Sequence, residues 1–298
     1  MNGIPMKHYY ELTKSGLVFG NIVAVIAGFL LGQSIAGSGM PVAKAATLAA
    51  AIIGLGLVMA SGCVFNNYLD RDIDGKMERT KRRALVMRRV SERNAIVFGT
   101  VLGVIGFFAL AVFTNAIAVA VAGIGFVFYV FIYTIGTKRR SPYGTAMGAI
   151  AGATPPVVGY AAAAGRVDLA ALILFFIMFT WQMPHFFAIA IRREEDYKAA
   201  NVPVLPVRSG VARTKLSMAI YIVEFIAASS LLAVFGYAGP TYLAIALALG
   251  AVWFVLAVRG FGITGVEHNR RWARSMFFFS LVVMVVLFGT IGIAAFAT

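Results

Sequence analysis

Cysteine and charge are both scarce in this chain. Cys63 is the single cysteine among 298 residues, which excludes an internal disulfide and a metal cluster held by several thiolates. Charged residues make up 13% of the sequence, whereas about 25% is usual in soluble domains. A soluble protein with so few charges would lack the polar groups to cover its surface, so the composition argues against a water-soluble enzyme.

Apolar residues replace the missing charge. They make up 60% of the chain, enough for about nine helical spans of ~20 residues each. The sequence therefore predicts an all-α, polytopic membrane protein that forms a single membrane-embedded domain over residues 1–298. No cleavable signal peptide is expected, because the first apolar run is too long and too interrupted by glycine. The predicted spans are 16–35, 45–65, 94–113, 116–135, 143–163, 169–190, 215–236, 240–259 and 274–296.

The distribution of positive charge predicts the orientation of the chain. The sequence has 26 Lys and Arg residues against 12 Asp and Glu residues, and all the basic residues except Lys44 and Arg166 fall on one side of the predicted spans. The positive-inside rule then places the N-terminus in the cytoplasm and the C-terminus outside a multi-pass protein of the cell (inner) membrane. Topology and contact with anionic lipid account for the excess of positive charge, so nucleic-acid binding is not expected.

Acidic residues gather in the most basic of the predicted cytoplasmic loops, directly after the second span. Asn66, Asp70 and Asp74 are four residues apart, so a helical continuation of the span would place them on one face. Carboxylates at this spacing repel each other, and more strongly at a membrane boundary. The pattern indicates a cation between them; the alternative is a solvated loop with internal salt bridges.

The oxygen ligands in this motif suit Mg²⁺. That ion takes one or two protein carboxylates and completes its shell with water and substrate phosphates. Asp70, Asp74 and Asn66 are therefore the expected metal ligands. The surrounding basic residues can neutralise the charge that the metal leaves on a diphosphate; they are Arg79, Lys81, Arg82 and Arg83.

Several runs of sequence carry a family resemblance. The runs 63–74 and 76–81, 181–186 (Trp-Gln-Met-Pro-His-Phe) and 196–207 resemble the UbiA-type intramembrane prenyltransferases, and within them the branch that acts on protoheme IX. Weaker matches are Thr13-Lys14 with Asn21, 141–145 and 152–156. The resemblance covers nearly the whole chain. It implies nine helices around a central cavity that opens to the cytoplasm and is capped by loops 66–93 and 191–214.

The resemblance also implies a reaction, in which farnesyl diphosphate, protoheme (heme b) and water give heme o and diphosphate with Mg²⁺ as cofactor. The implied partners are farnesyl diphosphate, heme b and the lipid bilayer, and it suggests a downstream heme a synthase or a terminal oxidase as well. Asp70, Asp74, His185 and Asp196 are the expected catalytic residues. The residues expected to bind the diphosphate are Asn66, Asn67, Arg79, Lys81, Lys138, Arg192 and Lys198.

Span six contains the candidates for heme binding, which are Trp181, Gln182 and His185. Pro184 lacks an N–H group and is expected to kink the helix, and polar side chains within a span must face the protein interior or a wet cavity. The resemblance makes His185 a candidate iron ligand or a candidate proton-transfer group at the substrate vinyl. The alternative is a kinked helix whose histidine bonds to a neighbouring carbonyl.

Asp196 follows span six, where members of the superfamily commonly carry a second Asp-x-x-x-Asp motif. This chain has Ala200 four residues later, so a second complete Mg²⁺ site is not expected, and Lys198 is a candidate to supply positive charge instead. Two other functions stay open. A prenyltransferase acting on a quinone precursor would keep the aspartates without needing His185, and a membrane transporter would rely on charges within spans, such as Glu224.

Overall fold

The computed structural model describes residues 6–37 and 42–297, and the regular secondary structure of this part of the chain is all helical, without strands. The all-α prediction is confirmed. The elements are α1 Met6–Leu12, α2 Ser15–Ile35, α3 Val42–Leu69, α4 Arg71–Asp74, α5 Glu92–Phe113, α6 Ala116–Val127, the π-helix η1 Phe128–Thr137, α7 Gly144–Gly152, α8 Thr154–Ala164, α9 Leu169–Arg192, α10 Glu194–Ala199, α11 Leu205–Val234, α12 Pro240–Arg259, the 3₁₀ helix η2 Gly260–Gly262 and α13 Val266–Ala297.

Eight helices within the described residues are long and apolar enough to cross a membrane. They correspond to eight of the predicted spans. The predicted span 143–163 differs, because it is divided at Ala153 into α7 and α8, each too short to be counted alone. Pro155 and Pro156 stand in the first turn of α8, and since proline has no N–H to continue a preceding helix, they start a new one. The count of nine spans stays a prediction.

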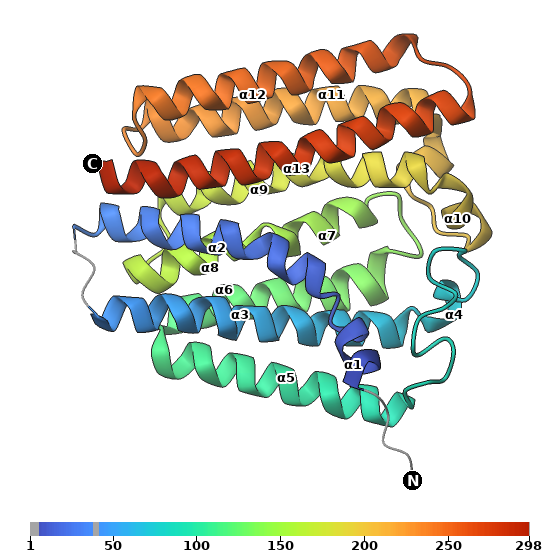
Figure 1. Ribbon diagram of the computed structural model, residues 1–298, viewed down its shortest axis with the longest axis horizontal. Helices are drawn as coiled ribbons and strands as arrows, with labels where there is room; N and C mark the ends of the chain where they lie inside the picture. The colour runs from blue at the N-terminus through green and yellow to red at the C-terminus, as the bar shows by residue number, and fades with distance from the viewer. Residues whose placement is uncertain (1–5, 38–41, 298) are drawn as a thin grey trace.

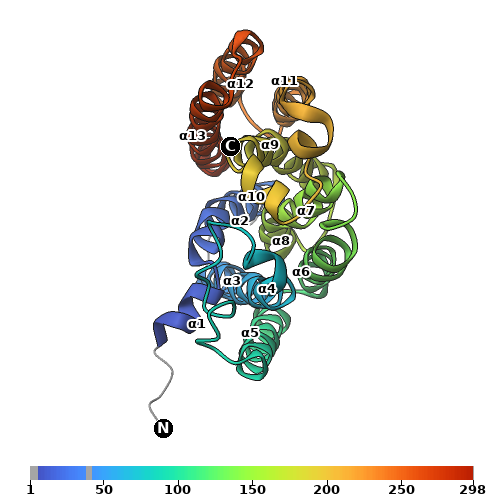
Figure 2. The same cartoon turned by 90° about the vertical axis from the view of Figure 1, so that its right-hand side faces the viewer.

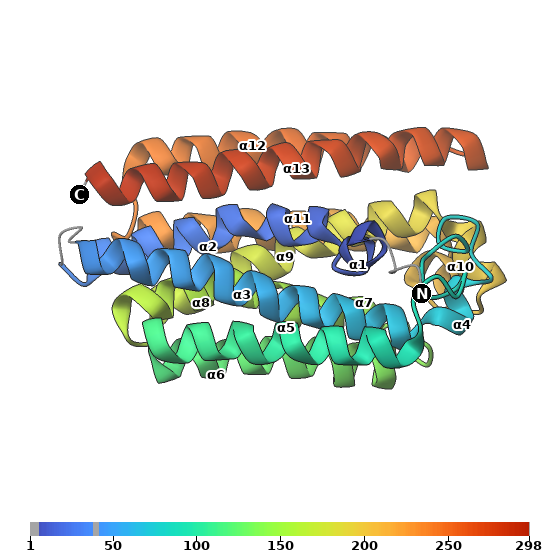
Figure 3. The same ribbon diagram turned by 60° about the horizontal axis from the view of Figure 1, so that its bottom comes forward.

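The long helices lie side by side along the longest axis of the molecule (Figures 1 and 3). Small residues set the distance between α2 and α8 in the middle of the bundle. A Cβ atom on Gly28 would lie 2.0 Å from the carbonyl oxygen of Pro156, and one on Gly159 would lie 2.1 Å from that of Val25. Glycine is therefore required at both positions, which allows these helices to approach closely.

The two ends of the bundle differ in character. Residues 70–91 and 193–204, with α4 and α10, cover one end, here called the loop end (Figure 2). The two segments contact each other, because Ile73 and Met77 pack against Ala200 and Val202. The opposite end, here called the turn end, carries the short connections 114–115, 165–168 and 235–239. The long connections thus meet at a single end of the bundle.

Candidate active site

Two adjoining cavities lie inside the bundle towards the loop end. The first is polar, about 290 Å³ in volume, and lies below α4 and α10. The second is larger, about 510 Å³, and its exposed lining is mostly apolar. The residues that line both cavities are Leu17, Tyr129, Gly148, Phe186 and Ile189. A molecule with a charged head and an apolar tail can therefore lie across the junction.

The acidic motif forms a wall beside the polar cavity. The α-helix α3 ends at Leu69, and Asp70 has φ −94° and ψ 1°, so the three polar residues do not continue one regular helix. Asn66 Nδ2 nevertheless donates to Asp70 Oδ2 at 2.8 Å. The side chains of Asn66, Asp70 and Asp74 are all buried. Asn66 and Asp70 are therefore in side-chain contact, and Asp74 follows after a turn, in place of the single helical face that the sequence predicted.

Each aspartate of the motif has a basic partner within the protein. Lys138 pairs with Asp70, Arg83 with Asp74 at 2.5 Å, and Arg139 with Asp72 at 2.7 Å. The carboxylates therefore do not need an added cation for lack of a partner, contrary to the prediction from the sequence. The carboxylates are already balanced by side chains, and a metal would have to share Asp70 and Asp74 with these lysine and arginine groups.

One oxygen of the motif is suited to a metal ion. Asp70 Oδ1 is buried and accepts no hydrogen bond, and Arg139 Nη2 lies 3.6 Å from it, beyond hydrogen-bonding distance. No group of three or more His, Cys, Asp or Glu side chains in the described part of the chain is placed to hold a metal. Since Mg²⁺ needs only one or two carboxylates when a substrate supplies phosphate oxygens, Asp70, Asp74 and Asn66 fit that ion.

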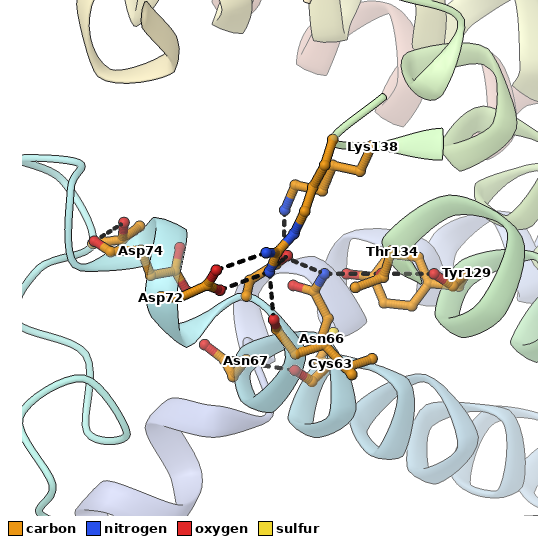
Figure 4. Close-up of polar contacts among 12 residues, drawn as sticks. Cys63, Asn66, Asn67, Asp72, Asp74, Tyr129, Thr134 and Lys138 are labelled. Carbon is orange, nitrogen blue, oxygen red and sulfur yellow. Dashed lines mark hydrogen bonds and ion pairs between the residues drawn. The ribbon is translucent and has the colours of Figure 1, made fainter. Parts of the chain in front are cut away.

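The π-helix η1 lies against the acidic motif, and its Thr134 and the following Lys138 face Asn66 and Asp70 (Figure 4). Asn66 Nδ2 donates to Thr134 Oγ1 at 3.0 Å, and Lys138 follows η1 directly. Tyr129 and Tyr133 of η1 line the polar cavity with Lys138. Such π-helical turns are rare and often mark functional sites; this one brings an aromatic pair and a lysine to the same cavity.

Lys14 completes the polar network. Its ammonium donates to Asn66 Oδ1 at 2.5 Å, and the side chain lines the polar cavity. Burial lowers the pKa of Lys14 to about 8. From the sequence, Lys14 was named only as part of a weaker family match and not as a site residue. Nothing in the sequence shows that the N-terminal arm folds back onto the end of α3.

The residues expected to bind diphosphate fall into two groups. Asn66, Arg79 and Lys138 line the polar cavity. The other four are absent from its lining among the described residues. Asn67 donates to the Leu12 and Cys63 carbonyls, Lys81 pairs with Glu78, Lys198 pairs with Glu194, and Arg192 stacks on Phe277.

Asp196 has a role in joining the two long connections. Its Oδ1 accepts a hydrogen bond from the backbone N–H of Glu78 at 2.9 Å. The residue does not line either described cavity, whereas its neighbour Tyr197 lines the polar one. The contact supports a positioning role for Asp196 within the loop end.

His185 faces the apolar cavity together with Trp181 and Gln182. Its ring is stacked between Trp181 and Phe277, with ring centroids 4.8 Å away on each side. His185 Nδ1 lies 2.7 Å from Ser280 Oγ, and that hydroxyl donates to the Phe277 carbonyl at 2.6 Å. Because a serine hydroxyl has one proton, this arrangement makes Nδ1–H the donor and leaves the lone pair on Nε2.

Ser280 and Phe277 were missed by reasoning from the sequence. Ser280 also accepts, through its carbonyl, a hydrogen bond from Trp181 Nε1 at 2.7 Å. In the sequence, Ser280 is only a single hydroxyl residue within the apolar run of the last span. Such residues are common in packed membrane helices, so nothing marks this one as part of a site. Gln182 donates to the Ala149 and Met178 carbonyls, so it joins α9 to α7.

Comparisons with known proteins agree with this architecture. Residues 21–282 match the model of the UbiA prenyltransferase family. The chain is 46% identical over 286 residues to the protoheme IX farnesyltransferase of Protochlamydia amoebophila, covering 96% of this chain and 98% of that protein. It is 45% identical over 282 residues to the protoheme IX farnesyltransferase of Yersinia pseudotuberculosis, covering 95% and 92%.

Solved structures share the fold. A digeranylgeranylglyceryl phosphate synthase superposes with a TM-score of 0.78 at 18% identity, covering 98% of this chain and 99% of that one. A UbiA homologue from Archaeoglobus fulgidus bound to GPP and Mg²⁺ superposes with a TM-score of 0.68 at 15% identity, covering 98% and 100%. The family match, the full-length relatives and the membrane-spanning helices together establish that this multi-pass membrane protein belongs to the UbiA prenyltransferase family.

Proposed function

We propose that this protein is a heme o synthase, which transfers the farnesyl group of farnesyl diphosphate to a vinyl group of protoheme IX with addition of water. The near full-length relatives named protoheme IX farnesyltransferase support this assignment. The observation that carries it is the junction of a basic, polar cavity with a larger apolar one that contains His185. The first suits a diphosphate, and the second suits an isoprenoid chain beside a flat apolar acceptor.

The diphosphate binds in the polar cavity. Lys14, Arg79, Arg83 and Lys138 supply positive charge there, and cationic side chains form strong hydrogen bonds with phosphate oxygens. Asp70, Asp74 and Asn66 would hold Mg²⁺, which when bound neutralises charge on the leaving diphosphate. Lys138 and Arg83 pair with these aspartates in the structure. When the diphosphate binds, both cationic side chains can exchange a carboxylate oxygen for a phosphate oxygen as their hydrogen-bond acceptor.

The acceptor lies in the apolar cavity. Trp181 and Phe277 fix the plane of the His185 ring, and Ser280 fixes its tautomer through Nδ1. The unprotonated Nε2 can then act on the acceptor in one of two ways. It either ligates the heme iron or accepts a proton during the reaction.

The chemistry follows from this division. The bond between C1 of the farnesyl group and the diphosphate oxygen breaks, and the electron pair leaves with diphosphate. The π electrons of the heme vinyl group form the new carbon–carbon bond, and water attacks the resulting porphyrin-side cation. That water loses one proton to a base, which gives the hydroxyl group of heme o. The apolar walls exclude bulk water from the allylic cation.

The test is an assay of purified protein with farnesyl diphosphate and heme, with product identified by chromatography and by the pyridine hemochrome spectrum. We expect heme o in the presence of Mg²⁺ and none after chelation by EDTA, with recovery on adding Mg²⁺ back. Asp74→Asn is the matched variant, and Lys81→Gln, an exposed lysine, is the control. Absence of heme o from the complete mixture, with transfer to an aromatic acid instead, would contradict the assignment.

A transporter function is less well supported. The one carboxylate in the middle of a predicted span, Glu224, is exposed on the outer side of α11 and lines neither described cavity. A transporter would be expected to place such a group along its pathway. The enzyme assay above separates the two functions directly, because a transporter would give no covalent product.

A further inference from the structure

Three arginines at the loop end have no acidic partner in the described part of the chain. Arg192 ends α9, Arg193 follows it as the C-cap, and Arg274 lies in the third turn of α13. The acidic residues nearby are already occupied, since Glu194 pairs with Lys198, and both Glu195 and Glu267 pair with Arg270. The positive charge of Arg192 is repelled by Arg193 and Arg274. A cluster of unpaired like charges is unfavourable unless an anion joins it.

The cluster adjoins the apolar cavity through aromatic rings. The Arg192 guanidinium lies 5.3 Å from the centroid of the Phe277 ring. The same Phe277 ring stacks on His185, and both residues line the apolar cavity. Arg274 lies 5.6 Å from the ring of Phe278, the neighbour of Phe277. The Arg192 guanidinium is thus one aromatic side chain away from the cavity that holds His185, whereas Phe278, which Arg274 contacts, is 50% exposed and follows Phe277 directly on α13.

The cavity reaches the outside of the bundle close to this point. Leu17 on α2 and Leu281 on α13 both line it, and they are 44% and 37% exposed. Leu281 lies two helical turns after Arg274 on α13. An acceptor in this opening would therefore place one edge near the arginines and the rest of its ring near His185.

The anion is not the diphosphate, because neither Arg192 nor Arg274 is among the residues that line the polar cavity. The acceptor under the proposed function carries two carboxylates on one edge of an apolar ring. Guanidinium groups bind carboxylates through two parallel hydrogen bonds and also stack on aromatic rings. We propose that Arg192 and Arg274 form the subsite for the paired carboxylates of a porphyrin, with the macrocycle entering the cavity beside Phe277. The identity of the ligand rests on the proposed function.

The experiment measures binding of zinc protoporphyrin IX and of its dimethyl ester, in which both carboxylates are blocked, to the purified full-length protein. Wild-type protein is expected to prefer the diacid. Because hydrogen bonds to charged groups are stronger than neutral ones, Arg192→Gln and Arg274→Gln should each weaken diacid binding about tenfold or more. Binding of the diester should stay unchanged, and the double variant should lose the preference.

Matched controls make the result specific. Arg271 is exposed on the same helix and has no side-chain contact among the described residues, so Arg271→Gln should behave as wild type. Arg192→Lys keeps the charge without the bidentate geometry and should give an intermediate preference for the diacid. Farnesyl diphosphate binding, followed separately, should be the same in all variants.

Three outcomes would overturn the inference. Equal weakening of diacid and diester would mean that the arginines only pack against the aromatic rings. An unchanged preference in the double variant would place the carboxylates elsewhere. A loss of binding to phosphatidylglycerol vesicles, with the porphyrin preference intact, would assign the cluster to lipid headgroups. If the wild-type protein bound neither porphyrin, the proposed acceptor itself would fail, which is a separate result.

Discussion

The two ends of the bundle use similar polar residues in different ways. At the turn end, polar side chains mostly bond to backbone groups; among the described residues, Asp168 also accepts from the side chains of Tyr160 and Arg166. Asn115 accepts from the Ala118 N–H and donates to the Ala161 carbonyl, and Lys44 donates to the Ala163 carbonyl. These contacts satisfy helix ends, which would otherwise leave backbone groups unpaired.

At the loop end the polar side chains bond mainly to one another, around a cavity. Lys14 contacts Asn66, Asn66 contacts Asp70, and Asp70 contacts Lys138. This network does little for helix ends and places opposite charges where a ligand can bind. The partner of a polar group, rather than its residue type, therefore separates a structural role from a functional one. Substitutions at the two ends should therefore affect different properties.

The largest effect is expected at Asp70. Asp70→Asn keeps the volume and removes the charge that holds Lys138 and would hold a metal. We expect heme o formation to fall by about 10²–10³-fold, as when a group that stabilises charge in the transition state is lost. Because the substitution also leaves Lys138 without its buried partner, the thermal unfolding midpoint should fall as well, so turnover is measured per mole of folded protein. Near wild-type turnover at saturating Mg²⁺ would remove Asp70 from the site.

A smaller effect on activity is expected at Ser280. Ser280→Ala removes the acceptor of His185 Nδ1–H and so releases the tautomer of the ring, without changing the polar cavity. We expect kcat/KM for heme to fall about tenfold, the size of one lost hydrogen bond to a functional group, with an unchanged KM for farnesyl diphosphate. Ser280→Thr should restore activity. If the alanine variant changed only thermal stability, Ser280 would be a packing residue.

At the turn end, Asp168 should affect stability and leave the chemistry alone. It caps α9 by accepting from the Ala170 and Ala171 N–H groups, and replacing such a cap costs about 1 kcal/mol. Asp168→Ala should therefore lower the unfolding midpoint, whereas Asp168→Asn, which can still cap the helix, should lower it less. Activity per folded molecule, measured as heme o formed per mole of folded protein, should remain that of wild type.

The same residue gives a pH dependence with a defined sign. Burial raises the pKa of Asp168, but hydrogen bonds from Arg166 and Tyr160 outweigh it and hold the pKa below its ordinary value of 3.8. A carboxyl group with a lowered folded-state pKa stabilises the fold above its unfolded pKa, and this contribution is lost as pH falls through the folded value. The stability difference between wild type and Asp168→Asn should shrink below about pH 4. A difference that grew on acidification would contradict this.

The smallest effects are expected at exposed ion pairs of the loop end. Lys198 pairs with Glu194, and its side chain is 56% exposed; surface pairs of this kind contribute about 0–1 kcal/mol. Lys198→Gln should leave heme o formation within about twofold of wild type, as expected for surface substitutions. Lys138→Gln should lower it strongly, because that lysine lines the polar cavity. An equal loss of heme o formation in both variants would show that activity depends on the total charge of the loop end rather than on the position of each lysine.

The sequence was sufficient for most of the fold and part of the site. Long apolar runs predicted eight of the helices, because the bilayer sets their length. The four-residue spacing indicated the contact between Asn66 and Asp70, whereas the turn that separates Asp74 from the end of α3 was not predicted. The break at Ala153 and the π-helical turn η1 were not predicted, since both depend on packing against neighbours. Lys14 and Ser280 reach the site from distant segments, and no local pattern reports such contacts.

The π-helix η1 also limits how this chain can change length. Each residue of a helix turns the next by about 100°, so deleting one residue within 128–137 would restore ordinary helical spacing and rotate Lys138 away from Asp70. An insertion would move it in the other direction. Single-residue gaps should therefore be tolerated in the short turns at the turn end, whereas within η1 they would separate the lysine from its carboxylate without altering any side chain.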